Sequence, residues 1–261
     1  MKLNLTNLIN TIKFNAIKSN RKWLLLMFLL CIPFISCKSQ DKEPTQQQES
    51  AIYALKDGNP NGIGKWFKGR EIAYVMGYQG MSWLERPERE KEENVSLLIK
   101  NMNIKDTDVI ADIGAGSGYH VFKMAPIAKE GIIYAVDIQP EMLAEIKQQK
   151  ENKSVENVTL VRGGEQSPNL PNNTIDKVLM VDVYHEFNYP FEMLLSIKSA
   201  LKKNGKIYLI EYRGEDPQIP IKTIHKMSEE QAVKEFEFAG FKLVKNIDNL
   251  PWQHCMVFEK K

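Results

Sequence analysis

The chain has 261 residues, of which 43% are hydrophobic and 26% are charged, which suffices for one large domain or for one domain with an extension. The net charge is +2, but residues 1–36 contain five basic residues and no acidic residue. The remainder therefore carries 30 basic and 33 acidic residues, a net charge of −3, which argues against a general nucleic-acid-binding protein.

The first predicted segment, residues 1–36, has the features of a targeting signal. A basic region precedes the 13 apolar residues Trp23–Ile35, and Pro33 interrupts them. A membrane-spanning helix needs about 20 apolar residues, so this length favours a signal-peptide core. Phe34-Ile-Ser-Cys37 resembles a bacterial lipobox, although leucine is usual in place of Phe34.

Lipidation of Cys37 would make the protein a membrane-anchored lipoprotein of the bacterial cell envelope. Three alternatives stay open: a membrane anchor that leaves the domain at the cytoplasmic face of the inner membrane, a membrane-skimming tail on a cytosolic protein, and a start site assigned too early. Residues 37–50 are polar, lack an apolar period and are predicted to be a flexible tether. Cys255 would be the remaining thiol, so no intrachain disulfide is expected.

Residues 51–104 are predicted to form an N-terminal lid and a leading helix. The first part, residues 51–86, is aromatic-rich and irregular, with a short helix predicted over Arg70–Val75. Pro87 is suited to the first turn of a helix, which we expect to continue to about Met102.

The lid is expected to hold the substrate through Tyr74 and Trp83, with Arg86 beside them. Packing of these side chains onto the edge of a sheet is the alternative interpretation.

Apolar strands and helices alternate over residues 105–261, which predicts a mostly parallel sheet covered by helices on both faces. Strands are predicted at 108–113, 131–137, 157–162, 176–181, 205–211, 241–247 and 253–259. Helices are predicted near 118–128, 140–151, 190–202 and 228–239. The short link between the last two strands predicts a hairpin, because parallel neighbours need a long crossover. Ligands bind outside the carboxyl ends of the strands in such sheets.

The most informative motif is a glycine turn at the end of the first of these strands. Val109-Ile-Ala-Asp-Ile-Gly-Ala-Gly-Ser-Gly118 has glycine at every second position of the turn. Glycine permits positive φ and lets a ligand approach the backbone. The next strand ends in Asp137, an acid placed to accept both hydroxyls of a ribose. Together these residues predict a nucleoside site.

The spacing favours a cationic nucleoside over a phosphorylated one. A dinucleotide fingerprint reads G-x-G-x-x-G, whereas here Asp112 precedes G-x-G-x-G, and its carboxylate would repel a phosphate. A P-loop is excluded because no G-K-[ST] follows. A strand–helix turn without a ligand is the structural alternative.

This turn, together with Asp137 and the order of strands and helices, resembles the class I S-adenosylmethionine-dependent methyltransferases over roughly residues 85–260. The resemblance implies a Rossmann-like, doubly wound sheet of seven strands with an antiparallel last strand, and S-adenosyl-L-methionine as the cofactor. A polar side chain at Glu165 or Gln166 would meet the adenine. The residues that the resemblance assigns to the cofactor are Asp112, Gly114, Ala115, Gly116, Gly118, Asp137, Ile138, Glu165 and Asp182.

The candidate catalytic residues follow the fourth of these strands. His185 is a candidate general base with Glu186 as its orienting acid, and Tyr184 is a candidate for cation–π contact with the sulfonium. Arg213, after the next strand, is a candidate for binding an acidic group of the acceptor. Structural hydrogen bonding is the alternative for each of these polar groups.

No metal site is expected, because His185, His225 and His254 lack a ligand spacing and no thiolate cluster exists.

The function implied is methyl transfer to a small molecule, a lipid-linked quinone or a protein side chain. The run Asp182-Val-Tyr-His185 departs from the D/N-P-P-Y/F motif of base N-methylases, so methylation of a nucleobase amine is disfavoured. A membrane-anchored, non-catalytic module that binds a nucleoside or a cationic ligand is the alternative, because methyl-donor supply is cytosolic whereas the leader points outward.

Overall fold

The computed structural model describes residues 52–261. The predictions of a signal segment, of lipidation at Cys37 and of a tether over 37–50 lie outside this range. In the described part of the chain, none of the helices has the length and apolar character needed to cross a bilayer.

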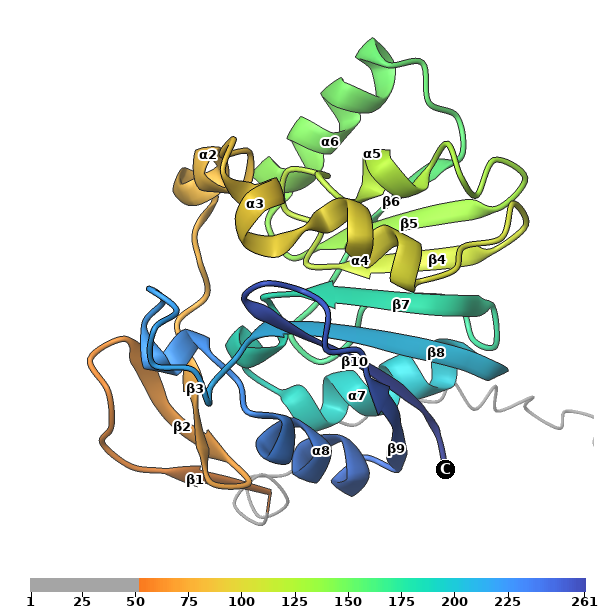
Figure 1. The fold of residues 1–261 in the computed structure, drawn as a ribbon. Coiled ribbons are helices and arrows are strands. Elements are labelled where there is room, and N and C mark those ends of the chain that lie inside the picture. Colours follow the sequence, from red (N-terminus) through yellow and green to blue (C-terminus); the bar gives the residue numbers. More distant parts are fainter. Residues whose placement is uncertain (1–51) are drawn as a thin grey trace, which may run out of the picture. The chain divides into compact units, whose positions relative to one another are not determined.

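The core is a seven-stranded sheet with the order β6-β5-β4-β7-β8-β10-β9 (Figure 1). Strands β4 to β8 pair in parallel, and β10 lies antiparallel between β8 and β9. This confirms the predicted fold class, including the antiparallel last strand. The strands are β4 (Val109–Ile113), β5 (Ile132–Asp137), β6 (Val158–Arg162), β7 (Ile175–Val181), β8 (Leu201–Tyr212), β9 (Phe241–Asn246) and β10 (Gln253–Lys260).

Both faces of the sheet are buried, because successive side chains of its strands enter two different hydrophobic clusters. In β7, Val178 and Met180 join one cluster while Leu179 joins the other. Helices α7 (Pro190–Ala200) and α8 (Glu229–Phe238) cover the first face. Helices α4 (Val95–Asn101), α5 (Val121–Met124) and α6 (Pro140–Asn152) cover the second. Continuous apolar strands are what a sheet buried on both faces requires.

The leading helix differs from the prediction of one helix up to Met102. It consists of α3 (Arg89–Glu93) and α4, separated by Asn94, whose backbone is left-handed with φ of 51°. Asparagine tolerates this conformation better than most residues, and its side chain caps α4 by accepting a hydrogen bond from the Leu97 N–H. Helix α5 is likewise shorter than the predicted 118–128.

The segment predicted as irregular forms a second, small antiparallel sheet of β1 (Tyr53–Leu55), β2 (Gly62–Phe67) and β3 (Arg70–Ala73). The short helix predicted over Arg70–Val75 is therefore wrong. Ile72 and Ala73 are fully buried, and pairing with β2 outweighs the local helical preference. The short helix α2 (Met81–Leu84) follows, after the 3₁₀ turn η1 (Tyr78–Gly80).

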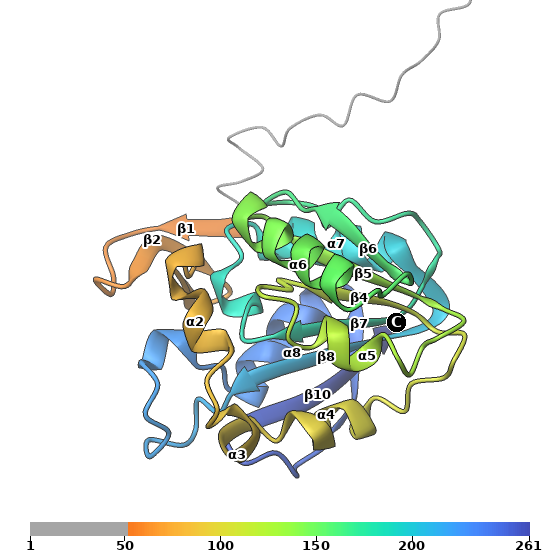
Figure 2. The same ribbon diagram turned by 90° about the horizontal axis from the view of Figure 1, so that it is seen from above.

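The small sheet and α2 lie at the end of the molecule toward which the parallel strands point (Figures 1 and 2). This is the end at which ligands bind in open α/β sheets.

Candidate functional site

The glycine turn after β4 has the backbone that its sequence predicts. Gly114, Gly116 and Gly118 have φ of 76°, 54° and 85°. A Cβ on Gly116 would lie 2.7 Å from Leu84 Cδ1 of α2, and a Cβ on Gly114 would collide with Val183. The turn therefore needs glycine both for its conformation and because neighbouring segments approach it closely.

Asp137 fixes this turn from the end of β5. Its Oδ2 accepts a hydrogen bond from the Gly116 N–H at 2.9 Å, and its Oδ1 accepts one from the Gln139 N–H at 2.8 Å. The Gly114 N–H also donates to the Val136 carbonyl at 2.8 Å. Burial raises the pKa of Asp137, and the backbone hydrogen bonds to its carboxylate only partly offset this shift. Each carboxylate oxygen retains a second lone pair, so Asp137 can accept further hydroxyl donors.

A cavity of about 550 Å³ opens between the glycine turn and the lid. This volume lies within the range of about 300–1,000 Å³ that is usual for small-molecule sites. Its walls combine the carboxyl ends of β4, β5 and β7 with segments that cover them. The covering residues are Val75, Met76, Trp83, Leu84, Pro220, Ile221, Lys222 and His225.

Six of the nine residues predicted to bind the cofactor line this cavity. They are Gly114, Gly116, Asp137, Ile138, Glu165 and Asp182. The other three lie behind it: Ala115 belongs to the hydrophobic core, Asp112 is buried, and a Cβ on Gly118 would meet Phe122 and Ile146. Gly118 thereby allows α5 and α6 to pack closely against the turn.

Two buried carboxylate oxygens lack a hydrogen-bond partner among the residues that the structure describes, Asp112 Oδ2 and Asp182 Oδ1. Asp182 lines the cavity, and its φ of 50° is rare for a residue other than glycine. Burial, then repulsion from Glu93 and Glu211, raises its pKa well above the ordinary value. Its Oδ2 accepts a hydrogen bond from Gln253 Nε2 at 2.7 Å, which leaves Oδ1 without a partner. A buried carboxylate oxygen without a partner is costly, and a cationic ligand group would relieve this cost.

Asp112 provides a pH-dependent test of this electrostatic arrangement. Burial raises its pKa to about 7; the guanidinium of Arg89 opposes this shift and Asp137 adds to it. Between about pH 4 and pH 7 the folded protein then holds a proton that the unfolded chain has lost. The contribution of Asp112 to the free energy of unfolding should fall by about 1.4 kcal/mol per pH unit over this range and level off above pH 7.

The measurement is urea unfolding of the wild type and of Asp112→Asn at several pH values. Asparagine does not titrate, so the variant should gain stability relative to the wild type as the pH rises. Parallel curves for the two proteins would contradict a raised pKa at Asp112.

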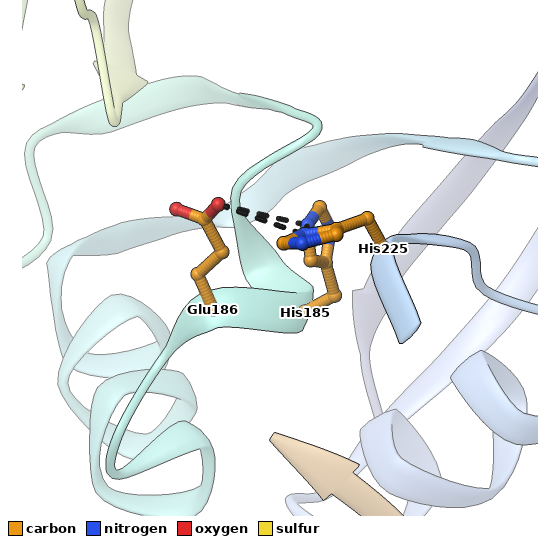
Figure 3. Close-up of side chains that lie close together, drawn as sticks. All are labelled: His185, Glu186 and His225. Atoms are coloured by element: carbon orange, nitrogen blue, oxygen red, sulfur yellow. Dashed lines mark hydrogen bonds and ion pairs between the residues drawn. The ribbon is translucent and has the colours of Figure 1, made fainter. Parts of the chain in front are cut away.

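In another part of the cavity wall, three polar side chains converge (Figure 3). His185 and Glu186 come from η2 (Tyr184–Glu186) after β7, and His225 from η3 (Thr223–His225) after β8. His185 Nε2 lies 3.1 Å from His225 Nδ1, and Glu186 Oε1 lies 3.8 Å and 3.9 Å from these two nitrogens. Glu211, fully buried at the end of β8, binds His185 Nδ1 at 2.7 Å.

Burial raises the pKa of Glu186 to about 7, although the neighbouring His185 lowers it. Burial also lowers the pKa of His225 to about 4, and the proximity of His185 adds to this effect. For His185, burial lowers the pKa, but the carboxylates of Glu211 and Glu186 outweigh it and the net shift is upward. The three groups thus form a coupled polar cluster inside an apolar cavity.

The expectation of no metal site rested on spacing in the sequence, and this spacing does not reveal the cluster. The two histidines are 40 residues apart, a spacing without meaning in sequence, yet the packing of η3 against η2 brings their rings together.

Three other candidates lie away from the cavity. Tyr184 is fully buried, packs on Phe236, and donates its hydroxyl to Glu235, so contact with a sulfonium is excluded by its position. Arg213 binds the Leu250 carbonyl and the carboxylate of Asp248, each at 2.9 Å, and does not line the cavity.

Tyr74 is 57% exposed and also lies outside the cavity wall, whereas Trp83 lines it with the Arg86 guanidinium 3.7 Å from its ring centroid.

Sequence reasoning missed Arg89 as a site residue. It lies in the cavity wall, where it binds Glu93 at 2.6 Å and the Leu84 carbonyl at 2.8 Å. Its position in a helix rich in charged residues gave no signal, because such residues are usually solvated.

The fold and the site together define an α/β domain with a cavity at the carboxyl ends of its parallel strands. Comparison with known proteins agrees, because the methyltransferase domain family matches residues 104–256. The chain belongs to the methyltransferase domain family.

Among curated proteins, the chain is similar to the uncharacterized methyltransferase YcgJ of Bacillus subtilis, at 24% identity over 62% of this chain and 64% of YcgJ. It is also similar to the fibrillarin-like rRNA/tRNA 2'-O-methyltransferase of Methanocaldococcus jannaschii, at 30% identity over 59% of this chain and 66% of that protein. The chain thus spans just under two thirds of the length of these two relatives. A solved structure, a SAM dependent methyltransferase from Aquifex aeolicus, has the same fold, with a TM-score of 0.67 at 20% identity over 70% of this chain and 98% of that one.

Proposed function

We propose that this protein is an enzyme that transfers a methyl group from S-adenosylmethionine to a small acceptor with an apolar body. The observation that carries the proposal is that one cavity joins Asp137 and the glycine turn to the cluster of His185 and Glu186. A methyl donor at the glycine turn and an acceptor at the polar cluster would therefore meet inside one cavity. Family membership and the fold support the same activity.

The residues present fit the proposed donor. Asp137 would accept the ribose hydroxyls, Glu165 lies in the wall where the adenine is expected, and the unpartnered oxygen of Asp182 favours the positive end of the methionine part. When bound, S-adenosylmethionine supplies an activated methyl group on a cationic sulfur. The contribution of the chain is then alignment of the two reactants, with a proton acceptor where the acceptor needs one.

The walls around the polar cluster support an acceptor that is mostly apolar. Met76, Trp83, Phe187, Pro220 and Ile221 line the cavity that contains it. Such an apolar wall excludes water and binds the aromatic or aliphatic surface of an acceptor. His185 and Glu186 are the polar groups in this wall that would fix the orientation of the acceptor.

We also propose that lipidation at Cys37 anchors the enzyme to a membrane, which would bring it close to lipid-soluble acceptors. The basic segment, the short apolar run and Ser36-Cys37 support this placement. Labelling cells with a palmitate analogue tests it, with Cys37→Ala as the control that should remain unlabelled.

The test of the activity uses the purified full-length protein with S-adenosylmethionine that carries a radiolabelled methyl group. Incubation with a membrane extract and with a pool of small aromatic alcohols should transfer label to an extractable product and release S-adenosylhomocysteine. Donor binding without any transfer to either pool would favour a non-catalytic binding module and count against the proposal.

A further inference from the structure

The cluster of His185, Glu186 and His225 has the composition of a metal site. Among the described residues, these three offer one ligand atom each, and all three atoms lie within 4.8 Å of one another. Imidazole nitrogen and carboxylate oxygen together are typical ligands of Zn²⁺ and related divalent ions. Figure 3 shows the carboxylate of Glu186 facing the two rings.

The distances within the cluster suit a small divalent ion. Zn²⁺ binds imidazole and carboxylate at about 2.0–2.2 Å, which in tetrahedral geometry separates the ligand atoms by roughly 3.4 Å. The separations here are 3.1 Å between His185 Nε2 and His225 Nδ1, and 3.8 Å and 3.9 Å from these nitrogens to Glu186 Oε1. Shifts of a few tenths of an ångström in these side chains, of which His225 is the most exposed at 26%, would equalise the three separations.

Glu211 supplies a second, independent observation. Its Oε2 lies 2.7 Å from His185 Nδ1, and its Oε1 accepts a hydrogen bond from the His185 backbone N–H at 3.3 Å. A carboxylate at Nδ1 fixes the tautomer of the ring and directs the lone pair of Nε2 toward the cluster. Histidines that bind metals almost always have such a carboxylate or carbonyl partner on the other ring nitrogen.

Two neighbouring cations, Arg70 and Lys222, have partners outside the cluster. Arg70 is engaged by Glu235 at 2.7 Å and reaches His185 through the backbone carbonyl of that residue. The ammonium of Lys222 donates to Asn61 Oδ1 at 2.7 Å. The two imidazoles and the carboxylate of Glu186 therefore face one another within the cluster.

We propose that this protein binds a divalent transition-metal ion, best matched by Zn²⁺, through His185 Nε2, Glu186 Oε1 and His225 Nδ1, with Glu211 as the residue that orients His185. Three protein ligands leave a fourth position, which faces the cavity that the same residues line. Sites with three ligands and an open position are those in which a metal acts on a substrate.

An ion at this position would polarise an acceptor oxygen and lower the pKa of its hydroxyl. This consequence rests on the proposed methyl transfer, whereas metal binding itself does not.

The test is metal binding by the purified full-length chain, stripped with a chelator and titrated with Zn²⁺ in a calorimeter. The wild type should bind one equivalent tightly. Loss of a residue that only orients a metal ligand weakens binding by about 10- to 100-fold. His225→Gln removes a ligand itself and should weaken binding by more than that. His225 is suited to substitution because 26% of its side chain is exposed, so the variant should remain folded.

The matched control is His254→Gln, a histidine bound to Glu215 and Asn246 outside the cluster. It should bind Zn²⁺ as the wild type does. Glu211→Gln should weaken binding by about 10- to 100-fold if its carboxylate orients His185. Cobalt substitution adds a structural readout, because Co²⁺ held by nitrogen and oxygen gives visible absorption without the intense near-ultraviolet band of a thiolate ligand.

Equal affinity of the wild type and His225→Gln would overturn the proposal, and so would an equal loss in His254→Gln. A cobalt spectrum dominated by thiolate would also overturn it. Neither titration contains a methyl donor or an acceptor, so absence of methyl transfer would leave the metal site standing, and absence of metal binding would leave the methyltransferase standing.

Discussion

Replacing Asp137 with alanine is expected to weaken the binding of S-adenosylmethionine by about 100-fold or more. Hydrogen bonds to a charged group contribute roughly 1.5–3 kcal/mol each, and a ribose with two hydroxyls can lose both. The same carboxylate also accepts the N–H groups of Gly116 and Gln139, so the variant would loosen the glycine turn as well. Calorimetric titration with the donor measures the effect.

Two control variants separate recognition from folding. Asp137→Asn retains an acceptor oxygen of similar size and should bind with intermediate affinity. Asp106→Ala removes an exposed acid near the opposite, amino-terminal end of β4 and should bind the donor as the wild type does. Thermal unfolding of each protein without ligand checks the fold. Donor affinity unchanged in a folded Asp137→Ala variant would remove Asp137 from the nucleoside site.

The centre of the sheet was predictable because β4, β5 and β7 are mainly apolar and are followed by, or end in, a glycine or an acid. The run Gly131–Asp137 does not alternate between apolar and polar residues, which is typical of a strand covered on both faces. The glycine turn and Asp137 were predictable for a related reason. β4 and β5 are adjacent parallel strands, so the residues at their carboxyl ends lie side by side at the same edge of the sheet.

What the sequence could not predict depends on contacts between distant segments. His225 becomes part of the site only because the chain after β8 folds back over the cavity, and the histidine itself has no local pattern around it. Tyr184 shows the opposite case. It adjoins His185 in sequence, but the short 3₁₀ turn points the tyrosine into the core while the histidine faces the cavity.

The small sheet was missed because β1 and β3 have only 3 and 4 residues. Strands so short carry little periodicity, and their stability comes from what they pack against. One such contact is ionic: Arg70 of β3 donates to both carboxylate oxygens of Glu235 on α8, at 2.7 Å and 2.9 Å. Arg70 also donates to the His185 carbonyl at 3.0 Å, so the small sheet, α8 and the site are joined by one side chain.

Glu235→Ala is therefore expected to lower the free energy of unfolding by about 3–5 kcal/mol, the cost of leaving a buried charge without its partner. Glu235 is fully buried and also accepts hydrogen bonds from the Tyr184 hydroxyl at 2.7 Å and from Gln231 at 2.8 Å. Its removal leaves a guanidinium that is 90% buried together with two neutral donors that have lost this acceptor. Urea unfolding at neutral pH measures the loss.

Glu237→Ala is the matched control on the same helix. Glu237 is half exposed and pairs with Lys261 at 3.4 Å, so its loss should cost less than about 1 kcal/mol.

The double variant Arg70→Met with Glu235→Leu should recover much of the stability lost in Glu235→Ala, because replacing a buried ion pair by apolar side chains of similar volume is often neutral. If Glu235→Ala cost no more than Glu237→Ala, the small sheet would be a separable lid. A large cost with recovery in the double variant would instead show that the small sheet supports the part of the cavity that contains His185. The guanidinium of Arg70 binds both Glu235 of α8 and the backbone carbonyl of His185.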